Sequence, residues 1–162
     1  LLGKGANSDM LSISVPSGSQ DVDQRTLQHH GEAHTTSDLL YKNALYDQAR
    51  TVFAGLIKVD EGAHYTDAYQ TCRNLLLSDE AEANAMPGLE INADQVKCSH
   101  GSTSGPITDD EVFYFNARGI PTETAKQLIT YGFTAEVFAK LGDSAIEAMV
   151  GQLVESKFRK LA

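Results

Sequence analysis

The stretch that decides the fold covers residues 94–118, which read DQVKCSHGSTSGPITDDEVFYFNAR. Its first part is typical of a strand and its second part of a helix, so it marks a joint between two parts of the chain. It also holds the only Cys-x-His pair in the sequence, Cys98 and His100. Residues two apart in a strand point to the same face, so we expect these side chains to project together, about 6–7 Å apart along the backbone. The glycine-rich run after His100 predicts that the chain loosens there as it leaves the strand.

The residues before this joint predict many short strands. Loops such as those around Gly62 and Pro87 separate them. Spacings of roughly 10–15 residues without Asn-Gly or Asp-Gly hairpin turns fit either a sandwich or a β-solenoid, and the pattern alone does not separate the two. The expected strands are Met10–Val15, Val22–His30, Asp38–Ala44, Thr51–Val59, Tyr65–Leu77 (with a bend), Gly88–Ile91 and Gln95–Ser99.

After Pro106 the hydrophobic period becomes helical. Thr108, with Glu111 three residues later, has the capping-box pattern that starts a helix. The division predicted from these patterns is a β domain over residues 1–106 and a small helical domain over residues 107–162, with more apolar surface than the β domain can cover. The other helix limits follow from Gly, Pro and Asp residues: a stop at Gly119, a second helix from Pro121 to before Gly132, a third over Phe133–Leu141 and a last from Asp143 toward Lys160.

Composition excludes several classes of function. The net charge of −9 argues against binding nucleic acid or an anionic membrane, because both need a basic surface. The sequence contains no run of eighteen apolar residues, so it predicts no membrane span. Cys72 and Cys98 are too few for a disulfide framework and indicate a reducing compartment, and we interpret Cys72 as a small core residue. Because the chain starts without Met, we interpret it as an excised fragment.

The candidate chemistry is confined to Cys98 and His100. The sequence has no Gly-x-Ser-x-Gly, His-Glu-x-x-His or dinucleotide-binding motif, so we predict no enzyme. A thiolate and an imidazole suit iron and zinc, yet a closed site needs about four ligands. The pair is therefore either structural or one half of a metal site. We interpret His29, His30 and His34 as strand and loop residues rather than ligands.

The joint resembles the SufB/SufD family of iron–sulfur cluster assembly scaffolds. The likeness lies in the CSHG motif at Cys98, in Gly105 and in the helix with Phe113-Tyr114 and Arg118-Gly119-Ile120. The CSHG form of the motif resembles the SufD branch, and the chain as a whole resembles the C-terminal portion of SufD-type proteins. The segments His34–Ser37, Arg50–Val59, Thr66–Thr71 and Arg73–Ser78 are also similar to the family. The resemblance implies a right-handed parallel β-helix (β-solenoid) followed by a small all-α C-terminal helical domain.

The resemblance also implies a role and partners. A SufD-like scaffold has no turnover of its own, pairs with SufB at the end of the β-helix and docks the ATPase SufC through the helical domain. Cys98 and His100 would then share iron or a transient iron–sulfur cluster with the partner subunit, with no cofactor bound tightly by the chain alone. The residues expected to bind a partner on the helical domain are Phe113, Tyr114, Arg118, Ile120 and Phe133.

The sequence leaves three points open. The protein could be a SufB-type scaffold, although the CSHG motif argues against it. It could also be a β-solenoid polysaccharide hydrolase or lyase, which needs clustered carboxylates or basic residues on successive coils, and the strands carry few such clusters. When isolated, the chain could pair with a second copy of itself. The expected location is the cytoplasm, or the stroma or matrix of an organelle in a eukaryote.

Overall fold

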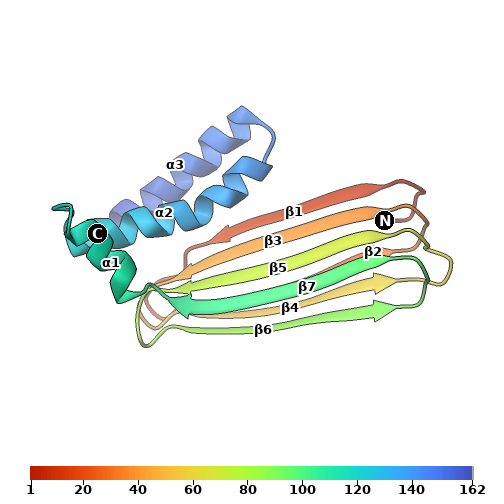
Figure 1. Ribbon diagram of the computed structural model, residues 1–162, viewed down its shortest axis with the longest axis horizontal. Coiled ribbons are helices and arrows are strands. Elements are labelled where there is room, and N and C mark those ends of the chain that lie inside the picture. Colours follow the sequence, from red (N-terminus) through yellow and green to blue (C-terminus); the bar gives the residue numbers. More distant parts are fainter. Residues whose placement is uncertain (162) are drawn as a thin grey trace.

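Seven strands precede three helices in the computed structural model, which describes residues 1–161 (Figure 1). The strands are β1 (Asn7–Ser14), β2 (Asp21–His30), β3 (Thr36–Leu45), β4 (Arg50–Val59), β5 (Asp67–Leu76), β6 (Glu82–Ile91) and β7 (Lys97–Pro106). The helices are α1 (Asp109–Asn116), α2 (Thr122–Lys140) and α3 (Ser144–Leu161). None of these helices is long and apolar enough to span a membrane.

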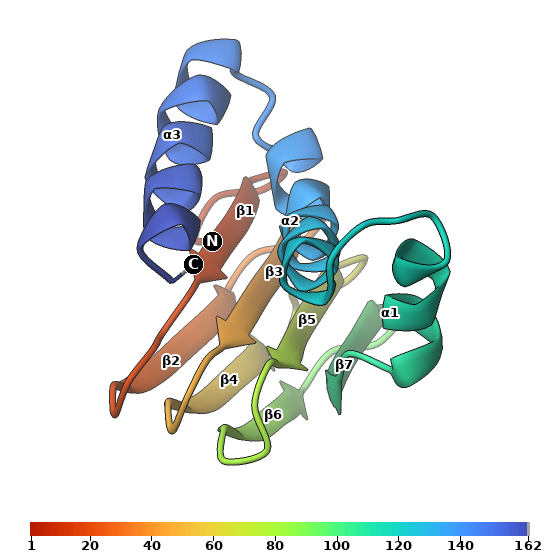
Figure 2. The ribbon, with the colours of Figure 1, turned by 90° about the vertical axis from the view of Figure 1, so that its left-hand side faces the viewer.

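The strands wind into a parallel β-helix. Alternate strands pair in parallel, so β1-β3-β5-β7 form a first sheet and β2-β4-β6 form a second sheet facing it (Figures 1 and 2). The register carries Asn7 onto Thr36, Thr36 onto Asp67 and Asp67 onto Lys97, so one turn takes 29–31 residues. The solenoid implied by the family resemblance is confirmed, and the sandwich is wrong.

One corner of the solenoid repeats in every turn. Gly5, His34, Tyr65 and Gln95 each lie two residues before a strand of the first sheet, and each has a positive φ between 55° and 75°. Residues other than glycine rarely adopt this conformation, so the fold of the turn imposes it at three of these positions. The rings of His34 and Tyr65 stack there, with centroids 4.8 Å apart.

Alternate residues of the strands fill the space between the two sheets. In β4, Phe53 and Ile57 point inward and are fully buried. Phe53 packs with Leu39 and Cys72 in one apolar cluster. Burial raises the pKa of the Cys72 thiol to about 11, which makes it unreactive at neutral pH. The interpretation of Cys72 as a core residue is confirmed.

A chain of polar side chains also crosses this core. The Asn43 side chain bonds to Gln24 of β2 (3.1 Å) and donates to Asn74 Oδ1 of β5 (2.8 Å). Asn74 in turn donates to Ser104 Oγ of β7 at 3.0 Å. Buried polar groups are tolerated when they are hydrogen-bonded. This amide ladder, Gln24–Asn43–Asn74–Ser104, therefore ties neighbouring turns together.

Three predictions about the strands are wrong. Residues Met86-Pro87-Gly88, expected as a loop, lie inside β6. Proline is tolerated there because β6 is an edge strand and the N–H that proline lacks needs no partner. The glycine-rich run after His100 does not loosen the chain, because β7 continues beside β5 to Pro106. The bend expected in Tyr65–Leu77 is also absent from β5, which runs unbroken.

The helix starts were predicted better than the helix ends. Thr108 and Glu111 form the expected capping box, and Asp143 caps α3 by accepting from the N–H of Ala145 at 2.8 Å. Gly119 has a φ of 78° and follows α1 as expected. The stop at Gly132 is wrong, because α2 is continuous from Thr122 to Lys140. A mid-helix glycine costs only about 1 kcal/mol, which packing of the flanking turns onto the sheet offsets.

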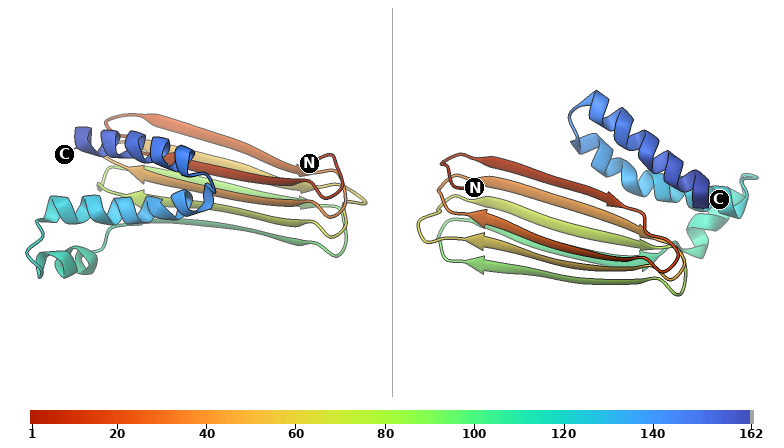
Figure 3. Two further views of the ribbon diagram at one scale, coloured as in Figure 1. Left: turned by 90° about the horizontal axis from the view of Figure 1, so that it is seen from above. Right: turned by 180° about the vertical axis from the view of Figure 1, so that it is seen from behind.

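Helices α2 and α3 cover the outer face of the first sheet near β1 and β3 (Figures 2 and 3). Phe138 of α2 and Phe158 of α3 pack with Ile13 and Val15. Lys42 of β3, with a side chain only 4% exposed, points into the junction. The helices therefore share a core with the β-helix, and the predicted domain limit at residue 106 stays a prediction.

Glu136 anchors α2 to the sheet by neutralising Lys42. The Lys42 ammonium lies 2.7 Å from Glu136 Oε2, donates to the carbonyl oxygen of Phe133 at 2.7 Å and stands over the Phe133 ring. The hydrogen bond from Lys42 lowers the pKa of the Glu136 carboxyl. We expect Glu136→Ala to lower the free energy of unfolding by about 1–3 kcal/mol in urea titrations, because a buried charge loses its partner.

The control for this prediction is Glu123→Ala. Glu123 pairs with Lys126 at 3.7 Å on the exposed surface of the same helix, with a side chain 82% exposed. Such pairs contribute about 0–1 kcal/mol. Equal losses for the two variants would contradict the anchoring role of Glu136.

Candidate functional site

The last turn of the β-helix has open edges within the described residues. β7 pairs with β5 and β6 pairs with β4, and neither has a strand on its other side. The backbone groups along such an edge are free to bind another strand. Leu89 and Ile91 of β6 lie on the inner face yet are 38% exposed, because no further turn covers them. This open end is thus suited to contact with another protein.

Cys98 and His100 lie together on the inner face at this open end. The register places Cys98 beside Ala68 and His100 beside Gln70, two buried residues of β5. Cys98 is half-buried and packs against the apolar cluster that includes Ile57. His100, one rung further, is exposed. The two donors therefore share a face, with the imidazole more accessible than the thiol.

The electrostatic environment separates these two donors. Burial raises the pKa of the Cys98 thiol, and the nearby Asp67 carboxylate raises it further. A thiol in such surroundings is mostly protonated at neutral pH and must lose its proton to bind a metal. The imidazole of His100, by contrast, is exposed to solvent. His100 is therefore the readier ligand of the two.

The donor set fits half of a site for iron or zinc. One sulfur and one nitrogen donor match the ligand preferences of these metals. Within residues 1–161, no group of three or more His, Cys, Asp or Glu side chains is placed to hold a metal ion. Any closed site at Cys98 and His100 must take its remaining donors from outside this part of the chain.

Three other histidines, at positions 29, 30 and 34, lie apart from this pair. His29 bonds to Asp60 at 2.6 Å on the surface. His30 is fully buried, with its ring nitrogens 2.7 Å from Thr35 Oγ1 and 2.8 Å from Ser37 Oγ, and burial lowers its pKa. Together with the stacked ring of His34, these contacts give each histidine a separate role in strand or loop.

The helical surface exposes several of the residues predicted to bind a partner. Phe113 is 70% exposed and Tyr114 is 56% exposed, and α1 buries no residue. The guanidinium of Arg118 lies 3.6 Å from the Tyr114 ring centroid and donates to the Tyr114 carbonyl oxygen. Ile120 is half-buried in the loop after α1. This end of the helical part presents aromatic surface to solvent.

Phe133 has a different setting, because its ring lies against the buried Lys42. Its packing holds α2 to the sheet and leaves it half-buried. The structure also exposes apolar residues of the helices that the sequence did not mark as surface residues. Among them are Leu128 of α2 and Met149 and Leu153 of α3, which are 47%, 56% and 65% exposed. Their apolar periodicity was visible, but periodicity does not tell which part of a stripe a sheet will cover.

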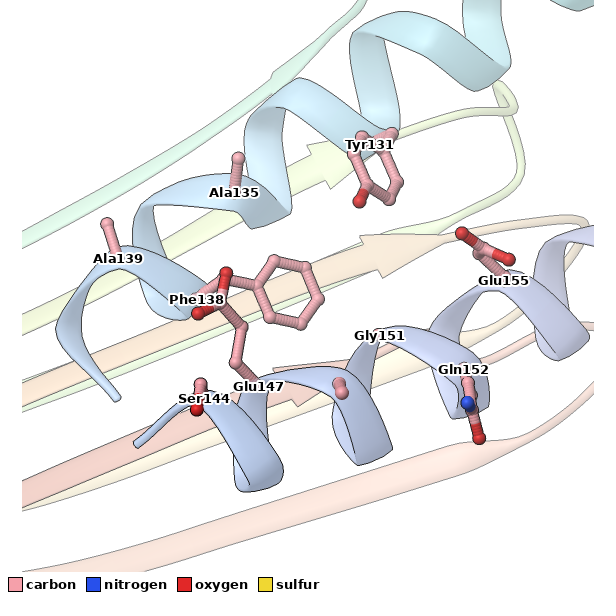
Figure 4. Close-up of a pocket in the computed structure, with 10 residues that line it drawn as sticks. Tyr131, Ala135, Phe138, Ala139, Ser144, Glu147, Gly151, Gln152 and Glu155 are labelled. Atoms are coloured by element: carbon pink, nitrogen blue, oxygen red, sulfur yellow. The ribbon is translucent and has the colours of Figure 1, made fainter. Parts of the chain in front are cut away.

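A hollow of about 500 Å³ separates α2 from α3 (Figure 4). Tyr131 and Phe138 of α2 face Glu147 and Glu155 of α3 across it. The residues lining this hollow include no cysteine or histidine, and it is widely open to solvent. It offers no donors comparable with Cys98 and His100, which remain the candidate site.

Comparisons with known proteins agree with the architecture. The family model described as "SUF system FeS cluster assembly, SufBD core domain" matches residues 1–133. The chain is 39% identical over 150 residues to the "Iron-sulfur cluster assembly protein SufD" of Escherichia coli, covering 93% of this chain and 36% of that protein. The protein of the same description from Bacillus subtilis is 31% identical over 160 residues, with 98% and 36% covered. "Protein ABCI7, chloroplastic" of Arabidopsis thaliana is 41% identical over 101 residues, with 62% and 21% covered. The chain thus spans about a third of the length of the two SufD relatives.

Proposed function

Because the chain belongs to the SufBD family of iron–sulfur cluster assembly proteins, we propose that it acts as a SufD-type scaffold subunit rather than as an enzyme. In this role the open end of the β-helix pairs with a SufB-type subunit, and the helical part docks a SufC-type ATPase. The observation that carries the proposal is the placement of Cys98 and His100 on one face at a free strand edge. The setting is the cytoplasm, or the interior of an organelle.

The unpaired strands support the proposed pairing at the open end. A partner strand that adds to β7 or β6 satisfies their free N–H and C=O groups and covers Leu89 and Ile91. The same contact brings donors of the partner next to Cys98 and His100. Iron or a nascent cluster, the cargo of assembly, is then held by ligands from both subunits. Affinity rises on pairing because both the number of ligands and their preorganisation increase.

Docking of the ATPase is assigned to α1 and the adjoining turns of α2. Large exposed apolar side chains that lie close together mark interaction surfaces. Phe113 and Tyr114 of α1 and Leu128 of α2 are large, exposed side chains, and the two helices contact each other. Aromatic residues and arginine contribute most to the affinity of such interfaces, and Arg118 already lies over the Tyr114 ring.

The test is the double variant Phe113→Glu with Tyr114→Glu in the full-length protein. Each hot-spot residue is worth about 2 kcal/mol or more, so we expect affinity for a SufC-type ATPase to fall by at least ~100-fold in calorimetric titration. The β-helix should stay folded, because α1 buries no residue.

Met86→Glu serves as the matched control. Met86 is 58% exposed on the outer face of the second sheet, away from the helices, and receives one substitution of the same kind, from an apolar side chain to Glu. ATPase binding should be unaffected by it. Undiminished ATPase binding by the double variant would rule out the proposed docking surface.

A further inference from the structure

Gln70 is a buried amide without hydrogen-bond partners. Its side chain is 1% exposed, and neither Oε1 nor Nε2 is bonded. The other amides on the inner face of the first sheet, Asn43 and Asn74, are held in the amide ladder. Buried polar groups without partners are rare, and each calls for an explanation. The position of Gln70 supplies one.

The Gln70 amide fills a space in the core that the residue on the opposite sheet leaves free. Gly55 of β4 faces it, and a Cβ placed on Gly55 would lie 2.5–2.7 Å from the three amide atoms of Gln70. Glycine at this position therefore makes the space that the amide fills. Thr26, the register neighbour of Gly55 in β2, also has a buried hydroxyl without a partner. The site is thus polar on both sheets.

The register puts His100 next to this amide. Along the first sheet, Gln70 lies between Leu39 of β3 and His100 of β7. Side chains on adjacent strands of one face stand about 5 Å apart. The rung of Asn74 shows that an amide of β5 reaches its β7 neighbour, because Asn74 donates to Ser104 Oγ at 3.0 Å. Since Leu39 is apolar, the imidazole is the polar neighbour of Gln70 along its own sheet.

We propose that Gln70 is a positioning residue for His100. The amide is unbonded in the structure. When the His100 ring turns toward it, Oε1 accepts the N–H of one ring nitrogen, which selects one tautomer and directs the lone pair of the other nitrogen to the open end. Metal-binding histidines almost always donate their second ring N–H to an oxygen of this kind. The consequence for metal binding rests on the proposed function, whereas the control of the tautomer does not.

The first measurement is the tautomer of His100 in the metal-free, full-length protein. Nitrogen-15 NMR of histidine-labelled protein reports which ring nitrogen carries the proton, and His100→Asn identifies the signal. We expect one tautomer in the parent protein and a mixture in Gln70→Met, which keeps the size of the side chain and removes the amide. Identical tautomer populations in the two proteins would overturn the inference.

Gln28→Met is the matched control. Gln28 is also a glutamine that is 1% exposed, but its amide donates to Ser37 Oγ and to the Tyr69 carbonyl oxygen. Its replacement should destabilise the fold and leave the His100 tautomer as in the parent protein. A mixed tautomer in this variant as well would show that general loosening of the core, rather than Gln70, controls the ring, and would overturn the inference.

The second measurement is the affinity for Co²⁺ of the complex with a SufB-type subunit, followed by absorption spectroscopy. Loss of an oxygen that orients a metal-binding histidine typically costs 10–100-fold in affinity, and we expect about this loss for Gln70→Met. Unchanged Co²⁺ affinity would overturn the link between Gln70 and metal binding. Absence of Co²⁺ binding by the parent complex would refute the proposed half-site, while the tautomer measurement would still decide the role of Gln70.

Discussion

Complexes that carry His100→Ala should retain at most about a tenth of the iron and sulfide of the parent complex. His100 is the accessible donor of the pair at the open end, and a site short of ligands cannot spare one. Even residues that only support a metal ligand are worth 10–100-fold in affinity, so loss of the ligand itself should cost at least as much. The measurement is the iron and acid-labile sulfide content of the complex assembled with a SufB-type subunit.

Subunit pairing should survive His100→Ala, because fewer than about 30% of interface residues cost more than about 1 kcal/mol of binding free energy when truncated to alanine. Size-exclusion chromatography with light scattering tests this. Ser102→Ala is the matched control, since Ser102 is the next inward-facing, exposed residue of β7 and has no role in the proposed site. Iron and sulfide at the parent level in the His100→Ala complex would reduce His100 to an ordinary interface histidine.

Asn43→Leu should lower the free energy of unfolding by about 2–5 kcal/mol. Leucine keeps the volume of the side chain, but it leaves the amides of Gln24 and Asn74 without their shared partner. Each buried group orphaned in this way costs about 1–3 kcal/mol. Urea denaturation followed by circular dichroism measures the loss, and weaker iron retention should accompany it because the ladder leads to β7.

The control for Asn43→Leu is Asn84→Leu. Asn84 lies in β6 on the exposed outer face of the second sheet and receives the same substitution. Its effect should stay within about 0.5 kcal/mol. A loss for Asn43→Leu as small as that of the control would show that the amide ladder is dispensable to the solenoid.

Sequence patterns identified the strands but not the way they stack. A solenoid and a sandwich share the same short strands, and the family resemblance at the CSHG motif decided between them. The capping box at Thr108 was predictable because both of its partners lie within four residues. The continuity of α2 through Gly132 was not, since packing of α2 against β1 and β3 overrides a local preference.

The candidate site was predictable to a similar extent. A two-residue spacing suffices to place Cys98 and His100 on one face of a strand. Nothing local indicates that Gln70 stands beside His100, because their adjacency comes from a register that joins residues thirty positions apart. Nor does the sequence indicate that burial raises the pKa of the Cys98 thiol, since the apolar cluster around it comes from β4, β5 and the loop between them.

The most direct test of the half-site is the affinity for Fe²⁺ under anaerobic conditions, measured for the full-length protein alone and in complex with a SufB-type subunit. The account predicts weak binding by the protein alone and an increase of at least ~100-fold on pairing, because the partner completes the ligand set. The increase should disappear in His100→Ala. Equal affinities with and without the partner, or an increase that persists in His100→Ala, would contradict the account.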